Sequence, residues 1–497
     1  MYYLSTRDPD LRVSAAEAIA RGLSAEGGLF LPVSIPQITP EELKALCALP
    51  YVERAKKILA PYLTDFTAEE LADCVKGAYG PQFASKEIAP LARLDENTYM
   101  LELFHGPTCA FKDMALQLLP RLLTMSAKKT GMAGELIILV ATSGDTGKAA
   151  LEGFRDVPGT RVLVFYPSEG VSPMQRLQMV TQEGGNVGVC AVKGNFDDAQ
   201  TGVKEIFTDG LTISRLAERG FAFSSANSIN WGRLVPQIAY YFSAYCDLVN
   251  SGGISFGDKI NFTVPTGNFG NILAAYYARE MGLPVGKLIC ASNQNRVLTD
   301  FIGTGTYNAR RDFFTTISPS MDILISSNLE RLLFLLSDNN AGQLKAWMRS
   351  LKETGQYTVP PEVLAKLQAL FWAGTCGEDD TRSAIERVWR EKRYLCDPHT
   401  AVGVKVLEQY REATGDNTPA VIAATANPFK FVAPVIQSAV GRRQESGDEF
   451  ELADRLSKIT RWQCPPQLLD LRGKKVRFPE AVEKTDMRRA LWNLLEN

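Results

Sequence analysis

The sequence has few residues of the kinds that form metal sites or disulfide frameworks. It contains two histidines, His105 and His399, and nine scattered cysteines without a C-x-x-C pair. A structural zinc site needs clustered Cys and His ligands, and disulfide frameworks belong to small secreted chains, so neither is supported. The 54 basic and 56 acidic residues nearly cancel and are interspersed. This balance argues against nucleic-acid and membrane-surface partners, and we expect a small-molecule substrate.

Long apolar runs are also missing. No stretch of about 18 uninterrupted apolar residues occurs, as a membrane span would need. The first residues, MYYLSTRDPDLRVSAAEAIA, lack the basic segment and apolar run of a signal peptide. We therefore expect a cytoplasmic protein. With 497 residues, 45% of them apolar and 22% charged, the chain has the composition of a globular protein with room for about three domains.

The first part of the chain is predicted to be mostly helical, over residues 14–87. Ser14 can cap the segment AAEAIARGL, and the segments ITPEELKALCALP and FTAEELADCVKGAYG each open with Thr and carry Glu in the first turn. From about residue 98, apolar β-branched runs alternate with helical patterns, as in ELIILVAT, SGDTG and KAALEGF. This alternation predicts parallel sheets covered by helices.

We predict three regions from this change of pattern. An N-terminal, mainly helical domain covers residues 1–95, a smaller α/β lobe covers residues 96–252, and a larger α/β lobe covers residues 253–497. SGGISFG, residues 251–257, is a candidate hinge between the two lobes. Residues 326–395 have the pattern of a helical insertion before the last predicted strand, AVIAATA.

Two glycine-containing loops follow predicted strands and suit an anion. SGDTG runs from Ser143 to Gly147, and TGNFGN runs from Thr266 to Asn271. Ligands of open α/β sheets bind at the carboxyl ends of strands. Glycines let the backbone approach closely, successive N–H groups form a concave donor nest, and the next helix presents its positive end. Two such loops suggest two phosphate groups, although each glycine pair can also serve only a tight turn.

Nucleotide-binding motifs fit these loops poorly. GNFGN lacks the G-x-G-x-x-G spacing of a dinucleotide fold. TSGDTGKA has Thr142 where an NTPase loop needs glycine, and Ala149 where it needs Ser or Thr. A kinase or a dehydrogenase is therefore disfavoured.

Lys112, in HGPTCAFKDMALQLLPRLL, is the candidate nucleophile. A lysine taken alone is usually a solvated surface residue. Here Phe111, Met114, Ala115 and Leu116 are apolar neighbours, and a lysine in such surroundings loses its proton more easily and suits a Schiff base. A phosphate nest on another strand and a polar loop complete what a phosphate-bearing aldehyde cofactor needs, which indicates pyridoxal phosphate.

The chain resembles the threonine synthase family, in its longer form, over nearly its whole length. The motifs that carry the resemblance follow in the family's order: EGGLFLP, FHGPTCAFKDMALQ, VATSGDTGKAA, SPMQRLQMV, SANSINWGRL, VPTGNFGNILA and ATANPFKF. The resemblance implies an α/β fold with two open, mainly parallel sheet lobes and flanking helices, the tryptophan synthase β-like fold type II of pyridoxal-phosphate enzymes, plus an N-terminal helical region. It also implies conversion of O-phosphohomoserine and water to threonine and phosphate, the last step of threonine biosynthesis.

The resemblance assigns roles to individual residues. Lys112 would hold the cofactor as a Schiff base, and Thr425 would give its hydroxyl to the pyridine nitrogen. The cofactor phosphate would be cradled by Gly267, Asn268, Phe269, Gly270 and Asn271. The substrate phosphate would be bound by Ser143, Thr146, Asn227 and Arg233. The planar guanidinium of Arg233 matches phosphate oxygens.

Two positions depart from the family's common pattern. The last motif has Asn427 and Phe429 in Thr-Ala-Asn-Pro-Phe-Lys-Phe, where relatives commonly have His-Pro-Ala-Lys, so the shape of that wall differs. Asp145 stands where many fold type II relatives have an asparagine facing the cofactor's phenolic oxygen, and the longer synthases share the aspartate. Neither change removes a group that the chemistry needs.

The implied mechanism depends on Lys112 as a mobile base. Its freed amine would remove the α-proton and move protons between Cα, the cofactor carbon and Cβ, so that phosphate leaves and water adds at Cβ. The lobes are expected to close and exclude water. Two alternatives stay open: another fold type II lyase, such as a dehydratase or a phospholyase, and a catalytically silent binding protein. We expect a monomer or a small homo-oligomer.

Overall fold

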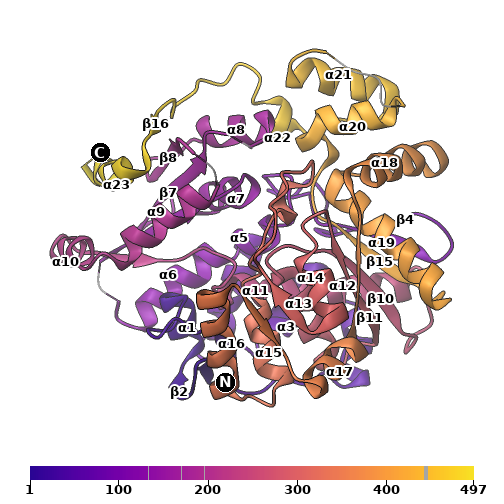
Figure 1. The fold of residues 1–497 in the computed structure, drawn as a ribbon, viewed down its shortest axis with the longest axis horizontal. Helices are drawn as coiled ribbons and strands as arrows, with labels where there is room; N and C mark the ends of the chain where they lie inside the picture. Colours follow the sequence, from indigo (N-terminus) through magenta and orange to yellow (C-terminus); the bar gives the residue numbers. More distant parts are fainter. Residues whose placement is uncertain (133, 170, 195, 442–445, 497) are drawn as a thin grey trace.

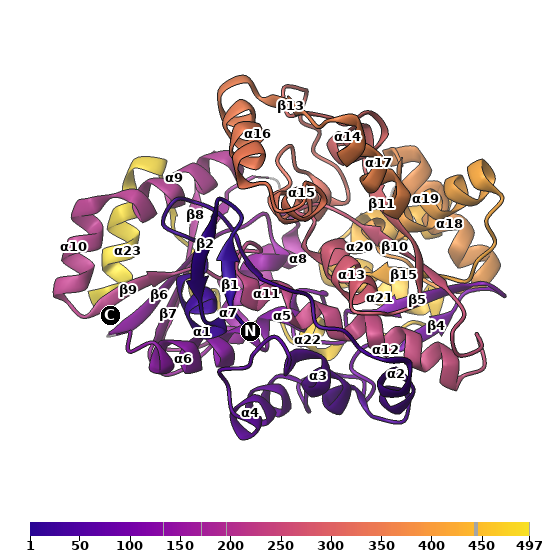
Figure 2. The same ribbon diagram turned by 90° about the horizontal axis from the view of Figure 1, so that it is seen from below.

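The computed structural model describes residues 1–132, 134–169, 171–194, 196–441 and 446–496 (Figure 1). Two α/β lobes lie side by side, each built on its own sheet, and Figure 2 separates them clearly. This is the predicted fold class, and it is confirmed. No helix in the described part of the chain is both long and apolar enough to cross a bilayer.

The first sheet has five strands, and every neighbouring pair is parallel. In spatial order its strands are β16 (Ala481–Val482), β8 (Val187–Val192), β7 (Thr160–Pro167), β6 (Glu135–Ala141) and β9 (Phe221–Ser224). The central strands read ELIILVA and TRVLVFYP, with nearly every residue buried. Continuous apolar runs of this kind suit a parallel sheet that helices cover on both faces.

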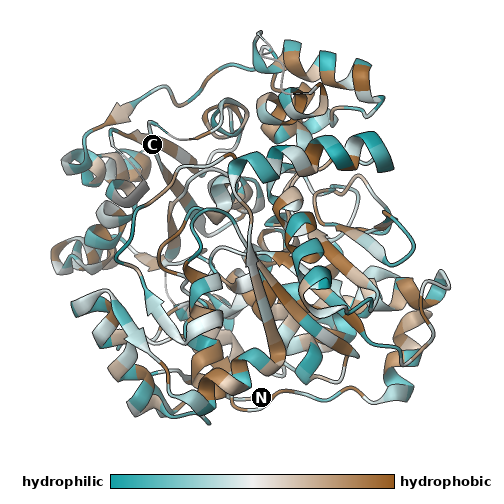
Figure 3. Ribbon diagram, turned by 45° about the vertical axis from the view of Figure 1, so that its right-hand side comes forward, coloured by the Kyte–Doolittle hydropathy of each residue, from teal (hydrophilic) through white to brown (hydrophobic). Residues whose placement is uncertain are grey.

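Helices surround this sheet in the alternating order predicted from the sequence. They are α6 (Leu119–Lys129), α7 (Asp145–Phe154), α8 (Pro173–Val180), α9 (Phe196–Thr208), α10 (Gly210–Glu218) and, from the end of the chain, α23 (Met487–Glu496). Figure 3 shows the apolar residues gathered on the strands and the polar ones on the outer surfaces of the helices. Burial of the apolar faces holds these layers together.

The second sheet has six strands, which are parallel except for one edge strand. In spatial order they are β14 (Phe371–Thr375), β11 (Val285–Ser292), β10 (Ile260–Pro265), β15 (Ala420–Ala424), β5 (Thr98–Glu102) and the antiparallel β4 (Leu91–Arg93). Its surrounding helices include α12 (Pro236–Asn250), α13 (Gly270–Glu280), α14 (Val297–Thr304), α18 (Glu378–Lys392) and α19 (Pro398–Thr414).

The sheets do not follow the predicted lobe boundaries. β5 lies inside the range 96–252 but joins the six-stranded sheet. β16 and α23 come from the range 253–497 but pack on the five-stranded sheet. Each lobe is therefore completed by a segment distant in sequence. An unpaired sheet edge or an uncovered apolar face is unfavourable, and any part of the chain can supply the strand or helix that covers it. The division into domains stays a prediction.

The N-terminal region is mostly helical, as predicted, with α1 (Ala15–Arg21), α2 (Pro40–Cys47), α3 (Tyr51–Leu59) and α4 (Ala68–Ala78). Capping boxes begin three of these helices, at Ser14, Thr39 and Thr67. A small antiparallel sheet, which was not predicted, is formed by β1 (Tyr3–Ser5), β2 (Asp8–Val13) and β3 (Phe30–Pro32). The region contacts both lobes, since α1 packs on α6 and α3 packs on α12.

The predicted helical insertion over residues 326–395 is mostly helical but also contains two strands. The segment contains α15 (Leu329–Leu336), α16 (Ala341–Thr354), α17 (Pro361–Leu370) and α18, but also β13 (Gln356–Thr358) and the sheet strand β14. β13 pairs with β12 (Thr306–Asn308), and β14 pairs with β11. FWAGT is short and contains aromatic residues, so its sequence fits either a helix or a strand. It forms a strand because it pairs with the apolar strand β11.

The remaining short elements connect these units. They are α5 (Asp113–Leu116), α11 (Trp231–Leu234), η1 (Pro319–Met321), η2 (Pro428–Phe431), α20 (Val432–Ala439), α21 (Glu449–Thr460), α22 (Pro466–Leu469) and η3 (Lys484–Asp486).

Trp231 is fully buried against Tyr3, Tyr62 and Tyr277. This aromatic cluster packs the N-terminal region behind the NSINWGR segment.

Candidate active site

Most of the predicted residues, among them Lys112, Arg233 and Thr425, line one cavity beside the carboxyl ends of β10 and β15. Thr425 directly follows β15, and its carbonyl accepts the backbone N–H of Phe111 at 2.8 Å. This bond attaches the segment that carries Lys112 to the six-stranded sheet. A cavity at this place is lined by Lys112, Thr146, Arg233, Gly267, Asn268, Phe269, Gly270, Asn271 and Thr425, and also by Ser228, Gln237, Ser320 and His399.

Lys112 lies just before α5, and its side chain points into the protein. The residue is 8% exposed, and its Nζ donates to Ser320 Oγ at 3.3 Å and lies 3.7 Å from Asp145 Oδ2. Burial lowers the pKa of Lys112 to about 8, against the opposing charge of Asp145. A lysine of this kind holds much more free amine near neutral pH than an exposed lysine does, as attack on an aldehyde requires.

Asp145, the first residue of α7, is the negatively charged neighbour of Lys112. Its Oδ1 accepts hydrogen bonds from Lys430 Nζ and from Gln175 Nε2, both at 2.7 Å. Burial would raise the pKa of Asp145, but the charges of Lys430 and Lys112 and the bond from Gln175 hold it well below its usual range. Asp145 is therefore a carboxylate.

The GNFGN loop leads from β10 into α13 and has the features of a phosphate cradle. Phe269 adopts a left-handed conformation with φ 64°, which turns the chain sharply into the helix. A Cβ on Gly267 would lie 2.6 Å from the carbonyl oxygen of Ser320, so only glycine allows this approach. Asn268 accepts bonds from Asn328 at its carbonyl. The first N–H groups of α13 have no partner within the helix and carry its positive end.

The SGDTG loop and the NSINWGR segment supply the remaining predicted residues. Thr142 Oγ1 accepts the N–H groups of Gly144 at 3.0 Å and Gly147 at 2.9 Å, which closes the turn into α7. Thr146 and Arg233 line the cavity, whereas Ser143 and Asn227 are half-buried in the adjoining turns and are not among its lining residues.

Arg233 is a buried cation with unused hydrogen-bonding capacity. It is 5% exposed, one of its Nη atoms donates to the carbonyl of Ala226, and its Nε has no partner. Burial lowers the pKa of Arg233 to about 10, so the group stays charged at neutral pH. A charged guanidinium with a free donor fits an oxyanion ligand.

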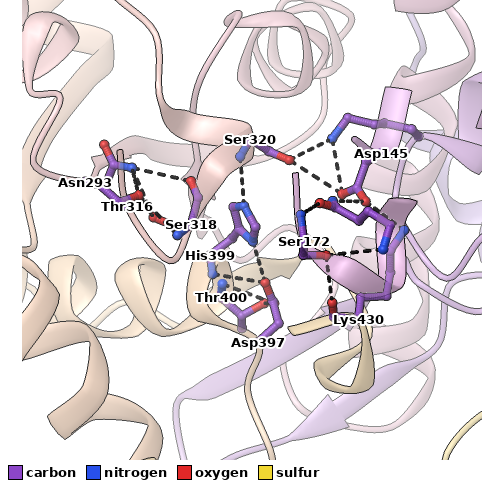
Figure 4. Close-up of polar contacts among 12 residues, drawn as sticks. Asp145, Ser172, Asn293, Thr316, Ser318, Ser320, Asp397, His399, Thr400 and Lys430 are labelled. Carbon is purple, nitrogen blue, oxygen red and sulfur yellow. Dashed lines mark hydrogen bonds and ion pairs between the residues drawn. The ribbon is translucent and has the colours of Figure 1, made fainter. Parts of the chain in front are cut away.

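Three residues at the site were not assigned a role from the sequence: Ser320, His399 and Lys430 (Figure 4). His399 Nδ1 lies 2.7 Å from Asp397 Oδ2, and its Nε2 accepts the backbone N–H of Ser320 at 3.1 Å. This pattern places the proton on Nδ1. Both ring nitrogens of His399 are therefore engaged in orienting a loop, and the described residues contain no cluster of three or more potential metal ligands.

The electrostatics of the site favour anions. Lys112, Lys430 and Arg233 are buried cations, and Asp145 is the carboxylate paired with two of them. Among the described residues no carboxylate pairs with Arg233. A buried excess of positive charge is costly without a ligand, and a phosphate group can supply the balance.

Pyridoxal phosphate fits the residues present. The Nδ2 of Asn271 is buried and has no partner, whereas its Oδ1 accepts the hydroxyl groups of Tyr240 and Tyr241. The Asn271 amide is thus held at the start of α13 with its Nδ2 free to donate. It lies in the same loop as Gly267, which the Ser320 carbonyl approaches closely. A buried amine, an anion cradle and a hydroxyl at the end of β15 match the aldehyde, the phosphate and the pyridine nitrogen of this cofactor.

A larger cleft of about 670 Å³ lies elsewhere, beside Arg93, Glu96, Tyr99, Asp247 and Ser251. It contains none of the predicted residues, and its lining carries both acidic and basic side chains. Size alone does not outweigh the convergence of polar groups in the smaller cavity.

Family models match the chain along most of its length. The model described as "Threonine synthase N terminus" matches residues 2–79, "Pyridoxal-phosphate dependent enzyme" matches residues 85–425, and "Threonine synthase, C-terminal" matches residues 400–485. The second model alone spans all the residues that line the cavity.

Curated relatives agree with these models. The chain is 42% identical over 454 residues to a Homo sapiens protein named threonine synthase-like 1, covering 88% of this chain and 60% of the relative. The chain thus spans about 60% of the length of the first relatives of this kind. It is 39% identical to the threonine synthase of Pseudomonas aeruginosa, covering 92% of this chain and 96% of that protein.

Solved structures are similar over the full chain. The crystal structure of PLP-bound threonine synthase from Brucella melitensis superimposes with a TM-score of 0.88 at 37% identity, covering 100% of this chain and 99% of that chain. Yeast threonine synthase gives a TM-score of 0.88 at 34% identity, with the same coverage.

Proposed function

The chain belongs to the threonine synthase family of pyridoxal-phosphate enzymes, and from this membership we propose that it converts O-phospho-L-homoserine and water to L-threonine and phosphate. The observation that carries the proposal is one cavity that combines the buried amine of Lys112 with the uncompensated cation Arg233 and the orphan amide donor of Asn271. An amine for an aldehyde and separate donors for two phosphates are what this reaction needs.

The cofactor would be held by residues from both lobes. Lys112 would bind its aldehyde carbon, the GNFGN loop its phosphate, and Thr425 its pyridine nitrogen. When bound, pyridoxal phosphate supplies an aldehyde for the substrate amine and a conjugated ring that accepts electrons from a broken Cα–H bond. A neutral hydroxyl at the pyridine nitrogen, in place of a carboxylate, disfavours full protonation of the ring.

Lys112 would act as the proton carrier of the reaction. The free amine of Lys112 would take the proton from the substrate Cα and deliver protons to the neighbouring carbons. Its lowered pKa supports this role, because the amine must be free to accept a proton. Ser320 and Asp145, the two groups near its Nζ, would keep the amine in place between transfers.

The substrate phosphate would lie against Arg233, with Thr146, Ser143 and Asn227 as further donors. Arg233 would hold the phosphate while the Cγ–O bond breaks, and water would then add at Cβ. The burial of Arg233 supports a site that excludes bulk water during the reaction. The segment 251–257 connects α12 to β10 within the same lobe, so the prediction that it is a hinge between the two lobes is wrong.

We also propose a class of partner, a cellular location and an oligomeric state for the protein. The partner is a small molecule rather than a nucleic acid or a membrane, as the balanced charge suggests. We place the protein in the cytoplasm, as a monomer or a small homo-oligomer. A phospholyase acting on another phosphorylated amine is the second candidate, because relatives named threonine synthase-like match as well as named threonine synthases do.

The experiment that tests the function measures cofactor, phosphate and threonine together. The purified protein should show the absorption band of attached pyridoxal phosphate, and Lys112→Ala should abolish the band and reduce turnover by at least about 1,000-fold. With O-phosphohomoserine, phosphate and threonine should appear in equal amounts. Phosphate without threonine would assign the chain to the phospholyases. A cofactor band without phosphate release would assign it to the silent binding proteins, and the absence of a band would refute a pyridoxal-phosphate enzyme.

A further inference from the structure

Asp145 is paired with two buried lysines, Lys112 and Lys430, and its two oxygens have different partners. Oδ1 accepts hydrogen bonds from Lys430 Nζ and Gln175 Nε2 on the side away from Lys112. Oδ2 lies 3.5 Å from Ser320 Oγ and 3.7 Å from Lys112 Nζ. The carboxylate is thus saturated by donors on one side, and its other oxygen faces the reactive amine.

Lys430 is the more deeply buried of the two lysines. It is 0% exposed, comes from η2 in the C-terminal part of the chain, and donates to the carbonyl of Thr108 at 2.9 Å as well as to Asp145. It does not line the cavity, and the proposed function gives it no role. An ammonium group at this depth costs free energy unless the protein uses it to hold a carboxylate.

Several charged groups surround Lys112, and they come from different elements. Asp145 on α7 raises the pKa of Lys112, whereas Lys430 on η2 and Arg233 on α11 lower it. Asp113 on α5 accepts bonds from Thr108, and Lys148 on α7 pairs with Glu152 at 3.0 Å. The imidazole of His399 on α19 is directed at the backbone of Ser320 and at Asp397.

We propose that Lys430 is a positioning residue for Lys112: its ammonium holds Asp145 as a carboxylate with Oδ2 turned toward Lys112, and it sets the balance between free amine and ammonium there. The proposal rests on the proposed function, because it concerns the lysine that would carry the cofactor. The negative charge of Asp145 and the positive charge of Lys430 cancel, so the pair as a whole is neutral beside the amine of Lys112. Removal of either member alone exposes Lys112 to a single unbalanced charge.

The direction of each change follows from the charges. In Lys430→Met a like charge is lost and Asp145 faces Lys112 alone, so the ammonium form of Lys112 is favoured and its pKa rises. In Asp145→Asn two cations remain and no carboxylate, so the pKa falls. The double variant Asp145→Asn/Lys430→Met removes both charges and returns the pKa toward the wild-type value. If Lys430 only anchored the Thr108 loop, the two single variants would not shift the pKa of Lys112 in opposite directions. The double variant would then not return that pKa toward the wild-type value.

The test measures the titration of Lys112 in the cofactor-free protein. Trace acetylation with acetic anhydride is followed across roughly pH 6–10, and the modified Lys112 peptide is quantified by mass spectrometry. Lys430→Met should raise the midpoint by about one pH unit, Asp145→Asn should lower it by a similar amount, and the double variant should lie within about half a unit of the wild type. Lys148→Met, a buried lysine paired with Glu152, is the control and should leave the midpoint unchanged.

An unchanged midpoint in folded Lys430→Met, or a shift in the same direction for both single variants, would overturn the proposal. If Lys430→Met does not fold, the comparison between Asp145→Asn and the double variant carries the same test, since adding Lys430→Met should raise the midpoint there too. The measurement needs neither cofactor nor turnover. A protein that shows these shifts without forming threonine would refute the proposed function alone, and one that forms threonine without the shifts would refute this inference alone.

Discussion

The imidazole of His399 accepts the backbone N–H of Ser320 at 3.1 Å. The other ring nitrogen faces Asp397, which caps the N-terminus of α19, so the ring cannot turn without breaking both contacts. Ser320 in turn presents its hydroxyl to Lys112 and its carbonyl to Gly267. One buried histidine thereby orients the segment that separates the reactive amine from the phosphate cradle.

Replacement of His399 by Leu should weaken cofactor binding by about tenfold. The N–H of Ser320 would be left buried without an acceptor, a cost of about 1–3 kcal/mol that a shift of the loop would relieve. Cofactor titration of the apoprotein, followed by absorbance, measures the effect. His105→Leu is the matched control, because the second histidine pairs with Glu102 and does not line the cavity. Equal affinities for the two variants would contradict this role.

Arg233 should determine the affinity for the substrate phosphate. Arg233→Met should raise the KM for O-phosphohomoserine by about 10- to 100-fold, because a charged hydrogen bond contributes about 1.5–3 kcal/mol. Arg233→Lys retains the charge but not the planar fork and should give an intermediate value. Steady-state kinetics measure both, and the cofactor band, which should stay unchanged, serves as the control. A wild-type KM in the Met variant would place the substrate phosphate elsewhere.

Arg331 should contribute strongly to stability. It is 0% exposed and donates to the carbonyl of Phe30 in β3, the side chain of Asn328 and the carbonyl of Ile229. It thus joins the N-terminal region to the NSINWGR segment and to Asn328, which itself donates to the GNFGN loop. Arg331→Met leaves three buried acceptors without a donor and should lower the free energy of unfolding by about 3 kcal/mol. Urea unfolding measures the change.

The control for Arg331 is Arg349→Met, at an exposed arginine on α16. Substitutions at exposed positions usually change stability by less than about 0.5 kcal/mol. A loss as small as this in Arg331→Met would show that the three bonds contribute little beyond the contacts of the aliphatic chain.

Asp113 should make the stability depend on pH in a defined window. It is 0% exposed, and burial raises the pKa of Asp113 to about 6, against the opposing hydrogen bonds from Thr108. The folded state therefore holds a proton that the unfolded state releases between its usual pKa of 3.8 and about 6. The stabilisation is present below this window and is lost as the pH rises through it.

Asp113→Asn should remove this dependence. Across roughly pH 4–6 the free energy of unfolding of the wild type should fall by about 3 kcal/mol relative to the variant, which corresponds to a shift of about two pKa units. Denaturant unfolding of both proteins at each pH measures the difference, and the variant serves as the reference for all other titrating groups. Parallel curves would show that Asp113 is ionised in the folded state.

Features that depend on neighbouring residues were predictable from the sequence. The capping boxes at Ser14, Thr39 and Thr67 are local patterns, because each cap contacts a residue three positions away. The strand, loop and helix units around SGDTG and GNFGN follow from the change of hydrophobic period at each loop. The apolar neighbours of Lys112 likewise indicated a buried lysine, and its 8% exposure agrees.

Features that depend on long-range pairing were not predictable in this way. FWAGT is short enough to be helix or strand, and only its pairing with β11 decides. β5 joins the sheet of β15 rather than that of β6, although β6 is much nearer in sequence. Ser320 and Lys430 lie in the short helices η1 and η2, and no local pattern shows that their side chains contact Lys112 or Asp145.

The sequence by itself therefore determined the α/β class and indicated the candidate anion loops and the candidate lysine, because each is set by the types and spacing of residues within one element. The tertiary structure alone decided which charges surround that lysine. Lys430 lies more than 300 residues from Lys112, yet both contact the same carboxylate. Burial in a common interior turns these contacts into strong electrostatic effects, and burial is a property of the packed chain rather than of any one segment.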